Sequence, residues 1–535
     1  MAVRRDFAIE IAAISAAFLG AIALIQPRGD FPLNDDGFYA LPTFELARTG
    51  HFHMTAVPAS LRAQVVWGAL FVRLFGASYH SLRIATVVSA LIAIAAVHAL
   101  LRMTALPRAA RVIAMLAFAF HPIFLWSSCT FMTETHFVCA SALALYCYAR
   151  GIRDERPGFL LLGCAFVAVS WWIRQTGVLT AIPPIALLVF LRRKRDAAIC
   201  AIAPVAYVVI GRFWPETLTS SKAVLGTFVD MWRDPVFHLE DAIALIYRHT
   251  FLPIQQTALW FLPVVAATLT RKLRKRDAAV AVLFAIGFIL SIRERLPMPY
   301  YGRRGWENVA GDIFMNFGLG PPTLSDVFSG SASYPFTLAY SARVTLTLVA
   351  TLAAIALVSA LLRTWRREVV FLLCAGYAAA HIAGLWVSAV YFDRYSLDSA
   401  WPLVIAAAIV APWHRAARFA AVALVACLAV FGILAVNEYF AWQRARWTAY
   451  DELRRGGVEA TNIDGGMEAE FTYLRPYVTD REYARSMRGS PPVRYAITFH
   501  ERSGFRVIAR HPFRGWLGLH RADVLTLQRI SGTSG

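Results

Sequence analysis

Charged residues are scarce in this 535-residue chain: Asp, Glu, Lys and Arg make up only 16% of it, whereas 58% of its residues are hydrophobic. Soluble globular domains carry about 25% charged residues and about 45–50% apolar ones. Together with a mean hydropathy of +0.52, this composition excludes a disordered chain, a collagen-like repeat and a secreted disulfide scaffold, and it argues against a single soluble domain. The class that remains is a polytopic α-helical membrane protein.

Acidic residues are in particularly short supply: 34 Asp and Glu stand against 53 Lys and Arg, which gives a net charge of +19. The basic residues do not form one face, as a nucleic-acid-binding protein would require. They stand in short bursts between apolar runs, at 192–195, 271–276 and 363–367, which is the pattern of cytoplasmic loops that set membrane orientation. The 7 cysteines lack zinc-ligand spacing and stand in apolar runs, so we expect neither a zinc site nor a disulfide.

Apolar runs that can cross a bilayer recur along the chain, and we predict about thirteen spans of about 20 residues or slightly fewer. They lie near 7–26, 80–101, 112–128, 131–149, 159–173, 177–191, 197–212, 250–269, 278–292, 340–362, 369–390, 402–413 and 419–436. Arg4 and Arg5 place the N-terminus inside, and the later basic bursts agree with that orientation. The first run lacks a small-residue cleavage site, so we expect it to be retained.

This orientation places the long loops and the tail outside the membrane. They cover 27–79, 213–249, 293–339, 391–401 and the residues from 440 onward. Inside loops are short and basic, so we expect the chemistry at the outer face. The tail begins with a helical pattern and continues with alternating stretches near 495–500, 505–510 and 524–528, which are typical of strands. We therefore predict a small α+β domain over 440–535 after a multi-span domain over 1–439.

The first outside loop carries two adjacent acids, Asp35 and Asp36, directly before a helical pattern with Tyr39 on one face. One explanation is structural, because Asn34 or Asp35 can cap a helix that lies on the membrane surface. The other is catalytic. A carboxylate at a rigid helix start can act as general base toward an acceptor hydroxyl, and its neighbour can orient a sugar or hold a divalent metal. The two explanations are compatible.

The segments 35–40 (DDGFYA) and 46–50 (LARTG) resemble the acidic motif in the first loop of GT-C membrane glycosyltransferases. The most similar group is the bacterial relatives of protein mannosyltransferases and of the lipid A aminoarabinose transferase. Further similar motifs are scattered over most of the chain: Leu74-Phe75-Gly76, Leu82-Arg83, His121-Pro122, Glu134, Arg394-Tyr395-Ser396-Leu397 and Ile463-Asp464-Gly465-Gly466. The resemblance implies an enzyme in the bacterial cytoplasmic membrane. Such an enzyme passes a sugar from a polyprenyl-phosphate carrier to a lipid, glycan or protein acceptor at the outer face, usually with inversion.

By position in the motif, the resemblance makes Asp35 the general base and Asp36 its neighbouring acid. The chain departs from the family pattern in two places. Many relatives have a Lys-Pro-Pro stretch before the second span, where this chain reads SLRAQ over 60–64. Relatives often have Leu-Pro after Arg-Tyr, where this chain has Leu397-Asp398. These departures leave open which residues contact the phosphate of the donor.

A lipid phosphate that leaves a sugar develops negative charge, which a nearby Arg stabilises. The candidate donor- and phosphate-binding residues are Arg394, Tyr395, Arg174, Arg62, Arg303, Arg304 and Tyr39. Arg394 is the strongest of them because it stands in the family-like pair, and the structural alternative is pairing with Asp393 or Asp398. Arg174 either marks the site or snorkels to the membrane interface. Lys222 is expected to be a solvated surface residue.

Glu134 is an acid at the outer end of a predicted span, and such acids often mark a cavity. It either faces the donor sugar, holds a divalent cation such as Mg or Mn together with Asp36, or is a satisfied loop residue. His51 and His53 lack a third ligand and are expected to be surface residues. The loop at 293–339 is rich in Gly, Pro and Arg, and we expect it to close over the donor.

A transporter or flippase of lipid-linked sugars is the alternative function. A transporter would be expected to show inverted repeats and interrupted polar helices near the midplane, and the sequence shows no such symmetry. A receptor or scaffold would explain the tail but not the acids. The acid pair and the long outside loops therefore favour the enzyme.

Overall fold

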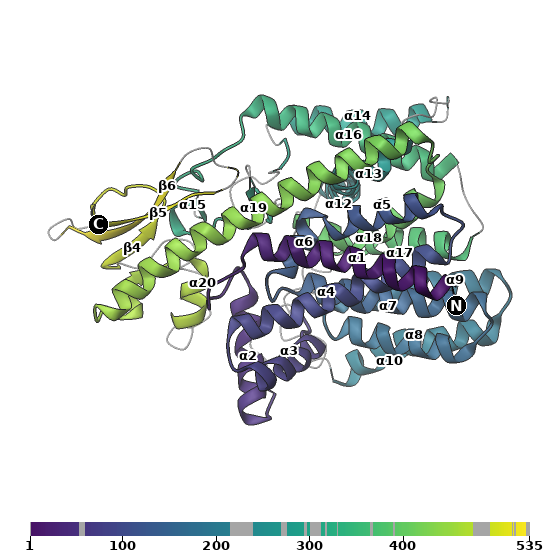
Figure 1. The fold of residues 1–535 in the computed structure, drawn as a ribbon, viewed down its shortest axis with the longest axis horizontal. Helices are drawn as coiled ribbons and strands as arrows, with labels where there is room; N and C mark the ends of the chain where they lie inside the picture. Colours follow the sequence, from purple (N-terminus) through teal and green to yellow (C-terminus); the bar gives the residue numbers. More distant parts are fainter. Residues whose placement is uncertain are drawn as a thin grey trace.

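The computed structural model describes residues 2–52, 59–214, 239–268, 275, 277–293, 297–299, 312–315, 318–328, 330–363, 368–388, 391–474, 493–515, 517 and 521–530. Figure 1 shows two parts, a bundle of long helices and a small sheet formed by the strands near the end of the chain. The predicted fold class is confirmed: the chain is mostly helical and ends in a small sheet.

The apolar runs fold into helices that pack side by side in the bundle. These helices are α1 Ala2–Ile25, α4 Tyr79–Arg102, α5 Arg108–Ala119, α6 Pro122–Ser128, α7 Thr133–Arg153, α8 Pro157–Trp171, η1 Gln175–Ala181, α9 Ile182–Phe190, α10 Lys194–Phe213, α12 Leu239–Trp260, α13 Leu262–Val265, η3 Ala266–Thr268, α14 Asp277–Arg293, α16 Tyr340–Arg363, α17 Val369–Leu385, α18 Ser396–Val410 and α19 Arg415–Arg455. Each predicted span overlaps between one and three consecutive helices.

Five helices in the described part of the chain are long and apolar enough to cross a bilayer on their own: α1, α4, α10, α16 and α19. Two bent pairs add to these, α5 with α6 at 57° and α12 with the segment Leu262–Thr268 at 79°. Pro122 and Pro263 stand in the first turn of the second helix of each pair, where a missing N–H is tolerated. The chain is a multi-pass membrane protein, and the number of about thirteen spans stays a prediction.

Two helices beside the bundle, α2 Asp36–Thr49 and α3 Arg62–Phe75, form the first predicted outside loop (Figure 1). Arg83 on α4 fixes the path of the chain that leads to them. Its buried guanidinium donates to the carbonyls of Pro27 and Phe31 at 3.2 and 2.8 Å. These carbonyls lie between α1 and α2, so Arg83 holds the segment directly before the acid pair.

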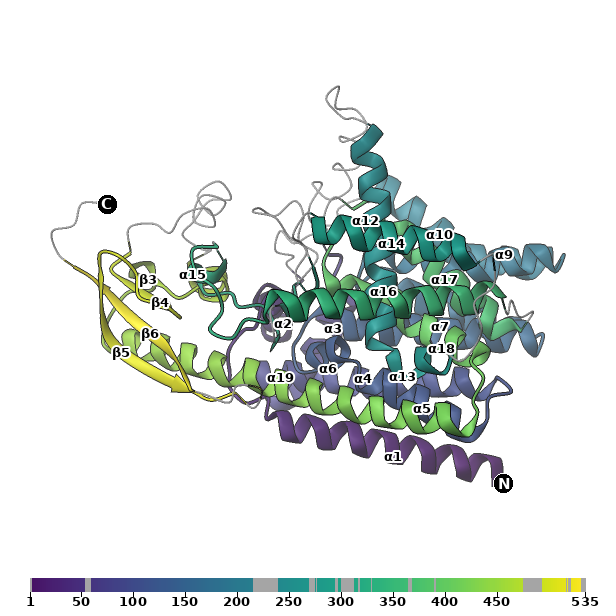
Figure 2. The ribbon, with the colours of Figure 1, turned by 90° about the horizontal axis from the view of Figure 1, so that it is seen from above.

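The helix α19 has 41 residues and runs from the bundle, beside α1, to the sheet (Figure 2). The predicted boundary between 439 and 440 falls inside it, and the helical pattern that opens the tail is its last part. The strands are β3 Ile463–Asp464, β4 Tyr495–Thr498, β5 Phe505–Phe513 and β6 Ala522–Arg529, in the order β3-β4-β6-β5. All three predicted strands are present. Only the β3–β4 pair is parallel among these described strands.

A short hairpin contacts the bundle, and a short helix that follows it contacts the sheet. The strands β1 Phe314–Met315 and β2 Gly318–Leu319 pair antiparallel, and α15 Ser325–Phe328 follows them. Both β2 and the sheet contact α19. The hairpin belongs to the long loop after α14, so α19 is the surface on which that loop and the tail meet.

Candidate functional site

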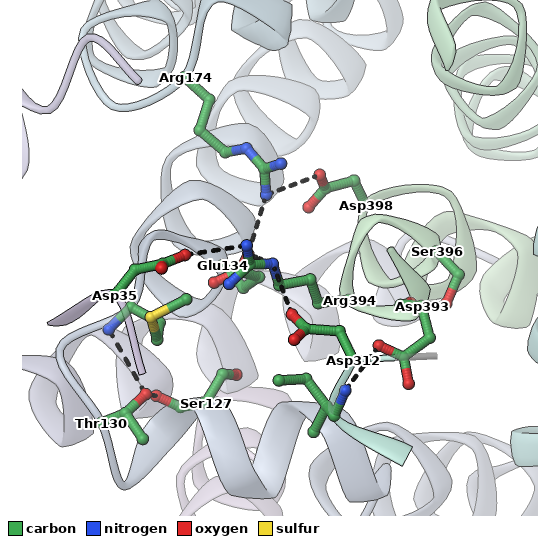
Figure 3. Close-up of polar contacts among 12 residues, drawn as sticks. Asp35, Ser127, Thr130, Glu134, Arg174, Asp312, Asp393, Arg394, Ser396 and Asp398 are labelled. Carbon is green, nitrogen blue, oxygen red and sulfur yellow. Dashed lines mark hydrogen bonds and ion pairs between the residues drawn. The ribbon is translucent and has the colours of Figure 1, made fainter. Parts of the chain in front are cut away.

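Arg394 lies at the centre of a group of carboxylates that come from distant parts of the chain (Figure 3). Its Nη2 donates to Oδ2 of Asp35 at 3.0 Å. Its Nε lies 3.1 Å from Oδ2 of Asp312 and 3.7 Å from Oε1 of Glu134. The guanidinium also packs over the ring of Tyr395, 5.8 Å from its centroid. Arg394, the strongest candidate for binding the donor phosphate, is therefore surrounded by acids. One of these acids is Asp35, the predicted general base.

Arg174 is the second cation of the same group. Its Nη1 lies 3.2 Å from Oε1 of Glu134 and 3.5 Å from Oδ2 of Asp398, so Glu134 is shared between the two arginines. The guanidinium covers the ring of Tyr395 from 4.7 Å. We call Asp35, Glu134, Arg174, Asp312, Arg394 and Asp398 the Arg394 cluster. Because its carboxylates outnumber its guanidiniums, it is negative when every member is ionised.

The backbone around Asp35 explains why its side chain can reach Arg394. Asp35 occupies the N-cap position of α2, yet its side chain makes no cap hydrogen bond. The carboxylate points to Arg394 instead and keeps 26% of its surface exposed. Capping therefore does not account for Asp35. Glu134, by contrast, is buried in the first turn of α7, where the helix dipole favours a negative charge.

Asp393 holds the long loop against Arg394 without joining the ion pairs. Its two carboxylate oxygens accept from the backbone N–H groups of Ile313 and Phe314, at 3.0 and 2.6 Å. Both bonds fix the chain directly after Asp312. The structural alternative for Arg394 was an ion pair with Asp393 or Asp398. The structure shows neither pair, because Asp393 accepts from backbone N–H groups and Asp398 pairs with Arg174.

Asp36 has a different environment from its neighbour Asp35. It is fully buried, and its oxygens accept from the backbone N–H groups of Leu33 at 2.5 Å and Phe131 at 3.3 Å. Burial raises the pKa of Asp36 to about 7, and the nearby Arg83 opposes that rise. Asp36 therefore ties the first loop to the chain before α7, and its described contacts are those of a structural residue.

The other predicted donor-binding residues have different surroundings. Tyr39 is buried, and burial together with the charge of Asp35 raises the pKa of its hydroxyl. Arg62 packs over the ring of Phe52 at 5.3 Å, on a segment whose backbone bonds to Trp172 and Ile173, next to Arg174. Four predicted residues lie outside the described residues: His53, Lys222, Arg303 and Arg304. Much of the loop at 293–339 is also outside them, so its closure over a donor stays a prediction.

A metal site was predicted at Asp36 and Glu134 if a divalent cation binds. The residues do not fit a shared site, because Asp36 accepts backbone N–H groups and Glu134 pairs with two arginines. In the part of the chain that the structure describes, no group of three or more His, Cys, Asp or Glu could hold a metal ion. We therefore derive no step through a metal.

Asp312 is the member of the cluster that sequence reasoning missed. Burial and the negative charges of Asp393 and Asp35 raise its pKa to about 7, while Arg394 lowers it. The only signal in the sequence is an acid before two apolar residues in a long loop. This pattern is too common to identify Asp312 as a site residue. Asp312 enters the site because Asp393, far along the chain, fixes the backbone that follows it.

Apart from the atoms that form the ion pairs, three polar atoms of the cluster are buried and have no hydrogen-bond partner among the described residues. They are Nη1 of Arg394, Oε2 of Glu134 and Oδ1 of Asp398. An arginine with an unused donor can bind phosphate, and a carboxylate beside it can accept a proton or a sugar hydroxyl. The arrangement can therefore bind an anion and take up a proton at adjacent places.

One family of known proteins matches part of the chain. Residues 67–214 match the family described as dolichyl-phosphate-mannose-protein mannosyltransferase. This match confirms the resemblance to GT-C membrane glycosyltransferases for that segment, which includes Glu134 and Arg174. No curated protein sequence matches the chain.

Solved structures with similar chains have low sequence identity and low TM-scores. ArnT from Cupriavidus metallidurans in the apo state is 14% identical, with a TM-score of 0.38 and 98% of each chain covered. The same protein bound to undecaprenyl phosphate is 12% identical, with a TM-score of 0.37 and 99% of each chain covered. The oligosaccharyltransferase AglB from Archaeoglobus fulgidus, in complex with an inhibitory peptide and a dolichol-phosphate, is 13% identical. Its TM-score is 0.40, and 84% of this chain and 59% of AglB are covered.

Proposed function

We propose, on the premise that residues 67–214 carry the family signature of membrane glycosyltransferases, that this chain transfers a sugar from a polyprenyl-phosphate donor to an acceptor. The acceptor is a lipid, a glycan or a protein. The reaction takes place at the outer face of a bacterial cytoplasmic membrane, with the N-terminus inside and the tail outside. The observation that carries the proposal is the contact of 3.0 Å between Arg394, which keeps an unused donor, and the partly exposed Asp35.

Asp35 supplies the base in this reaction. Its carboxylate takes the proton of an acceptor hydroxyl, and the acceptor oxygen attacks the anomeric carbon of the donor sugar. The bond between that carbon and the phosphate oxygen breaks in the same displacement. Because the nucleophile enters opposite the leaving group, the anomeric configuration inverts. The partial exposure of Asp35 gives an acceptor access to the base.

Arg394 supplies the cation for the leaving group. The lipid phosphate gains negative charge as the bond breaks, and a guanidinium stabilises that charge in a site with little water. Arg174 acts from the next position and shares Glu134 with Arg394. Three carboxylates around Arg394 would repel a phosphate, so a proton on Asp312, whose pKa is about 7, favours donor binding.

The test is transfer of a labelled sugar from a polyprenyl-phosphate donor by the purified protein in lipid vesicles. We expect Asp35→Asn to lower the rate by about 10²–10⁴-fold, because the amide cannot take the proton. Glu45→Gln is the matched control, an acid on the same helix outside the Arg394 cluster, and it should keep the wild-type rate. Full activity of Asp35→Asn would show that Asp35 is not the base.

A flippase of lipid-linked sugars is the second candidate, favoured by the bent helix pairs at 57° and 79°. It predicts a different result for the same variants. Movement of a fluorescent polyprenyl-phosphate sugar between leaflets would survive Asp35→Asn, and no new glycosidic bond would form. Sugar transfer that Asp35→Asn abolishes excludes this alternative.

A further inference from the structure

The tail of the chain reaches back to the residue that precedes Asp35. Oε1 of Glu468, in the short helix α20 Met467–Ala469, accepts from the backbone N–H of Asn34 at 3.0 Å. Asn34 itself has a φ of +54°, in the left-handed region, which Asn tolerates better than other non-glycine residues. The bond to Glu468 helps to fix the backbone in this conformation.

Glu468 is in turn held by three side chains. It is fully buried, and its Oε2 accepts from Nη1 of Arg446 at 2.7 Å. Thr323 donates its hydroxyl to the carboxylate at 2.5 Å, and Nε2 of Gln443 lies 3.4 Å from Oε1. Arg446 is also fully buried, so the two charges compensate each other inside the protein.

The glycine motif before Glu468 fits the same contact. Gly466 has a φ of +84°, and a Cβ there would stand 2.6 Å from the carbonyl oxygen of Thr323. That carbonyl accepts from the N–H of Met467 at 3.1 Å. Arg446 donates from Nε to the carbonyl of Gly465 at 2.8 Å. The motif therefore lets the tail approach the chain around residue 323 at hydrogen-bond distance.

The two segments that Glu468 contacts carry two of the three acids that face Arg394. Asn34 directly precedes Asp35. Thr323 follows the hairpin β1–β2, which begins just after Asp312. Asp35 and Asp312 lie on either side of the same guanidinium, at 3.0 and 3.1 Å. The buried carboxylate of Glu468 thus contacts both the segment that carries Asp35 and the loop that carries Asp312.

We propose that Glu468 is a positioning residue, which holds the segments of Asn34 and Thr323 so that Asp35 and Asp312 face Arg394. Glu468 acts through the backbone and through Thr323, and it takes no proton from a substrate. The inference deepens the proposed glycosyl transfer and rests on it for its effect on rate. Its effect on the backbone around Asn34 does not depend on any activity.

Three variants separate positioning from stability. Arg446→Met/Glu468→Leu removes both buried charges, so the protein has no unpaired ion to bury, but it also removes the acceptor for Asn34. Glu468→Gln keeps an acceptor oxygen at that position. Asp326→Asn is the matched control, because Asp326 is a buried acid of the same long loop whose carboxylate accepts from the N–H groups of Phe499 and His500 and makes no contact with Asn34.

Two measurements are made on each variant in lipid vesicles: hydrogen–deuterium exchange of the peptide over 31–40, and the kinetics of sugar transfer. We expect Arg446→Met/Glu468→Leu to speed exchange of this peptide and to lower kcat by about 10²-fold with little change in KM for the donor, because a displacement of about 1 Å costs that much. Glu468→Gln should recover most of kcat. Asp326→Asn should leave both measurements at the wild-type values.

Unchanged exchange over 31–40 in the double variant overturns the positioning role, whatever the value of kcat. Faster exchange in the double variant supports that role even if the wild-type protein transfers no sugar. The absence of sugar transfer by the wild-type protein would contradict the proposed function but not the positioning role of Glu468.

Discussion

Two buried arginines of this protein, Arg394 and Arg446, have opposite surroundings. Arg446 pairs with one carboxylate, Glu468, at 2.7 Å, and neither side chain is exposed. Arg394 faces three carboxylates at 3.0–3.7 Å, and one of them, Asp35, is 26% exposed. The first pair is neutral and closed, whereas the Arg394 cluster has an excess of negative charge and an opening toward its base.

The difference separates a structural pair from a reactive one. A closed one-to-one pair contributes a fixed geometry, and removing one partner leaves an uncompensated charge. A buried cluster with unbalanced charge is costly in a folded protein, and such departures from local consistency concentrate where chemistry occurs. The pair around Arg446 thus supports the Arg394 cluster, and the two should respond differently to the same kind of substitution.

The strongest test of the difference between the two arginines is to remove the guanidinium of Arg394. We expect Arg394→Gln to lower kcat/KM for sugar transfer by about 10³-fold, because the leaving phosphate loses its main cation. Arg394→Lys keeps the charge but not the forked geometry and should lose less. Arg48→Gln, at an exposed arginine of α2, is the control for loss of charge. Wild-type kinetics in Arg394→Gln would remove Arg394 from the mechanism.

The corresponding substitution at the closed pair should affect stability first. Arg446→Gln leaves Glu468 buried without its ion partner, and we expect it to lower the free energy of unfolding by about 3 kcal/mol. Thermal unfolding in detergent measures this change. Arg454→Gln, at an exposed arginine on the same helix, should have no comparable effect. An Arg446→Gln protein as stable as the Arg454→Gln protein would contradict the assignment of the pair as structural.

A change of pH should shift the balance of charge around Arg394. The pKa of Asp312 is raised to about 7, so its carboxyl loses its proton as the pH rises through that value. The additional negative charge then weakens donor binding, and we expect KM for the donor to rise roughly 3- to 10-fold between pH 6 and pH 8. Asp312→Asn cannot ionise and should show a flat profile. An equal rise in Asp312→Asn would assign the effect to another group.

Local pattern predicted the helices and strands well, because each depends on residues close together in the chain. The apolar runs became helices, and the alternating stretches near 495, 505 and 524 became β4, β5 and β6. Bends were harder to predict, since Pro122 and Pro263 interrupt apolar runs that hydropathy alone reads as continuous.

The site was predicted in part, and the missing part depends on long-range contacts. Asp35, Glu134, Arg174 and Arg394 stand in or near recognisable motifs, and the structure brings them together. The motif made Asp35 the base and Asp36 its neighbouring acid, but only the fold shows that backbone N–H groups occupy the carboxylate of Asp36.

Asp312 and Glu468 were missed for a related reason. Their partners lie in distant segments: Asp312 meets Arg394, and Glu468 meets Asn34 and Thr323. No local pattern around either residue indicates such a contact. A motif of glycines before Glu468 was visible, but its fit against the carbonyl of Thr323 requires the fold.

The smallest effect is expected from removing divalent cations, and it tests whether the carboxylates of the Arg394 cluster are free to bind metal. Glu134 is held by Arg174 and Arg394, and Asp36 by two backbone N–H groups, so a cation would have to displace partners already in place. We therefore expect sugar transfer in EDTA to stay within about twofold of the rate with Mg²⁺ or Mn²⁺, since hard cations need several free oxygen ligands. Loss of activity in EDTA, restored by Mg²⁺ or Mn²⁺, would mean that the cluster opens when the donor binds. The two arginines would then differ in whether their ion pairs can open: those of Arg394 would open to admit a cation, whereas the pair of Arg446 with Glu468 would stay closed.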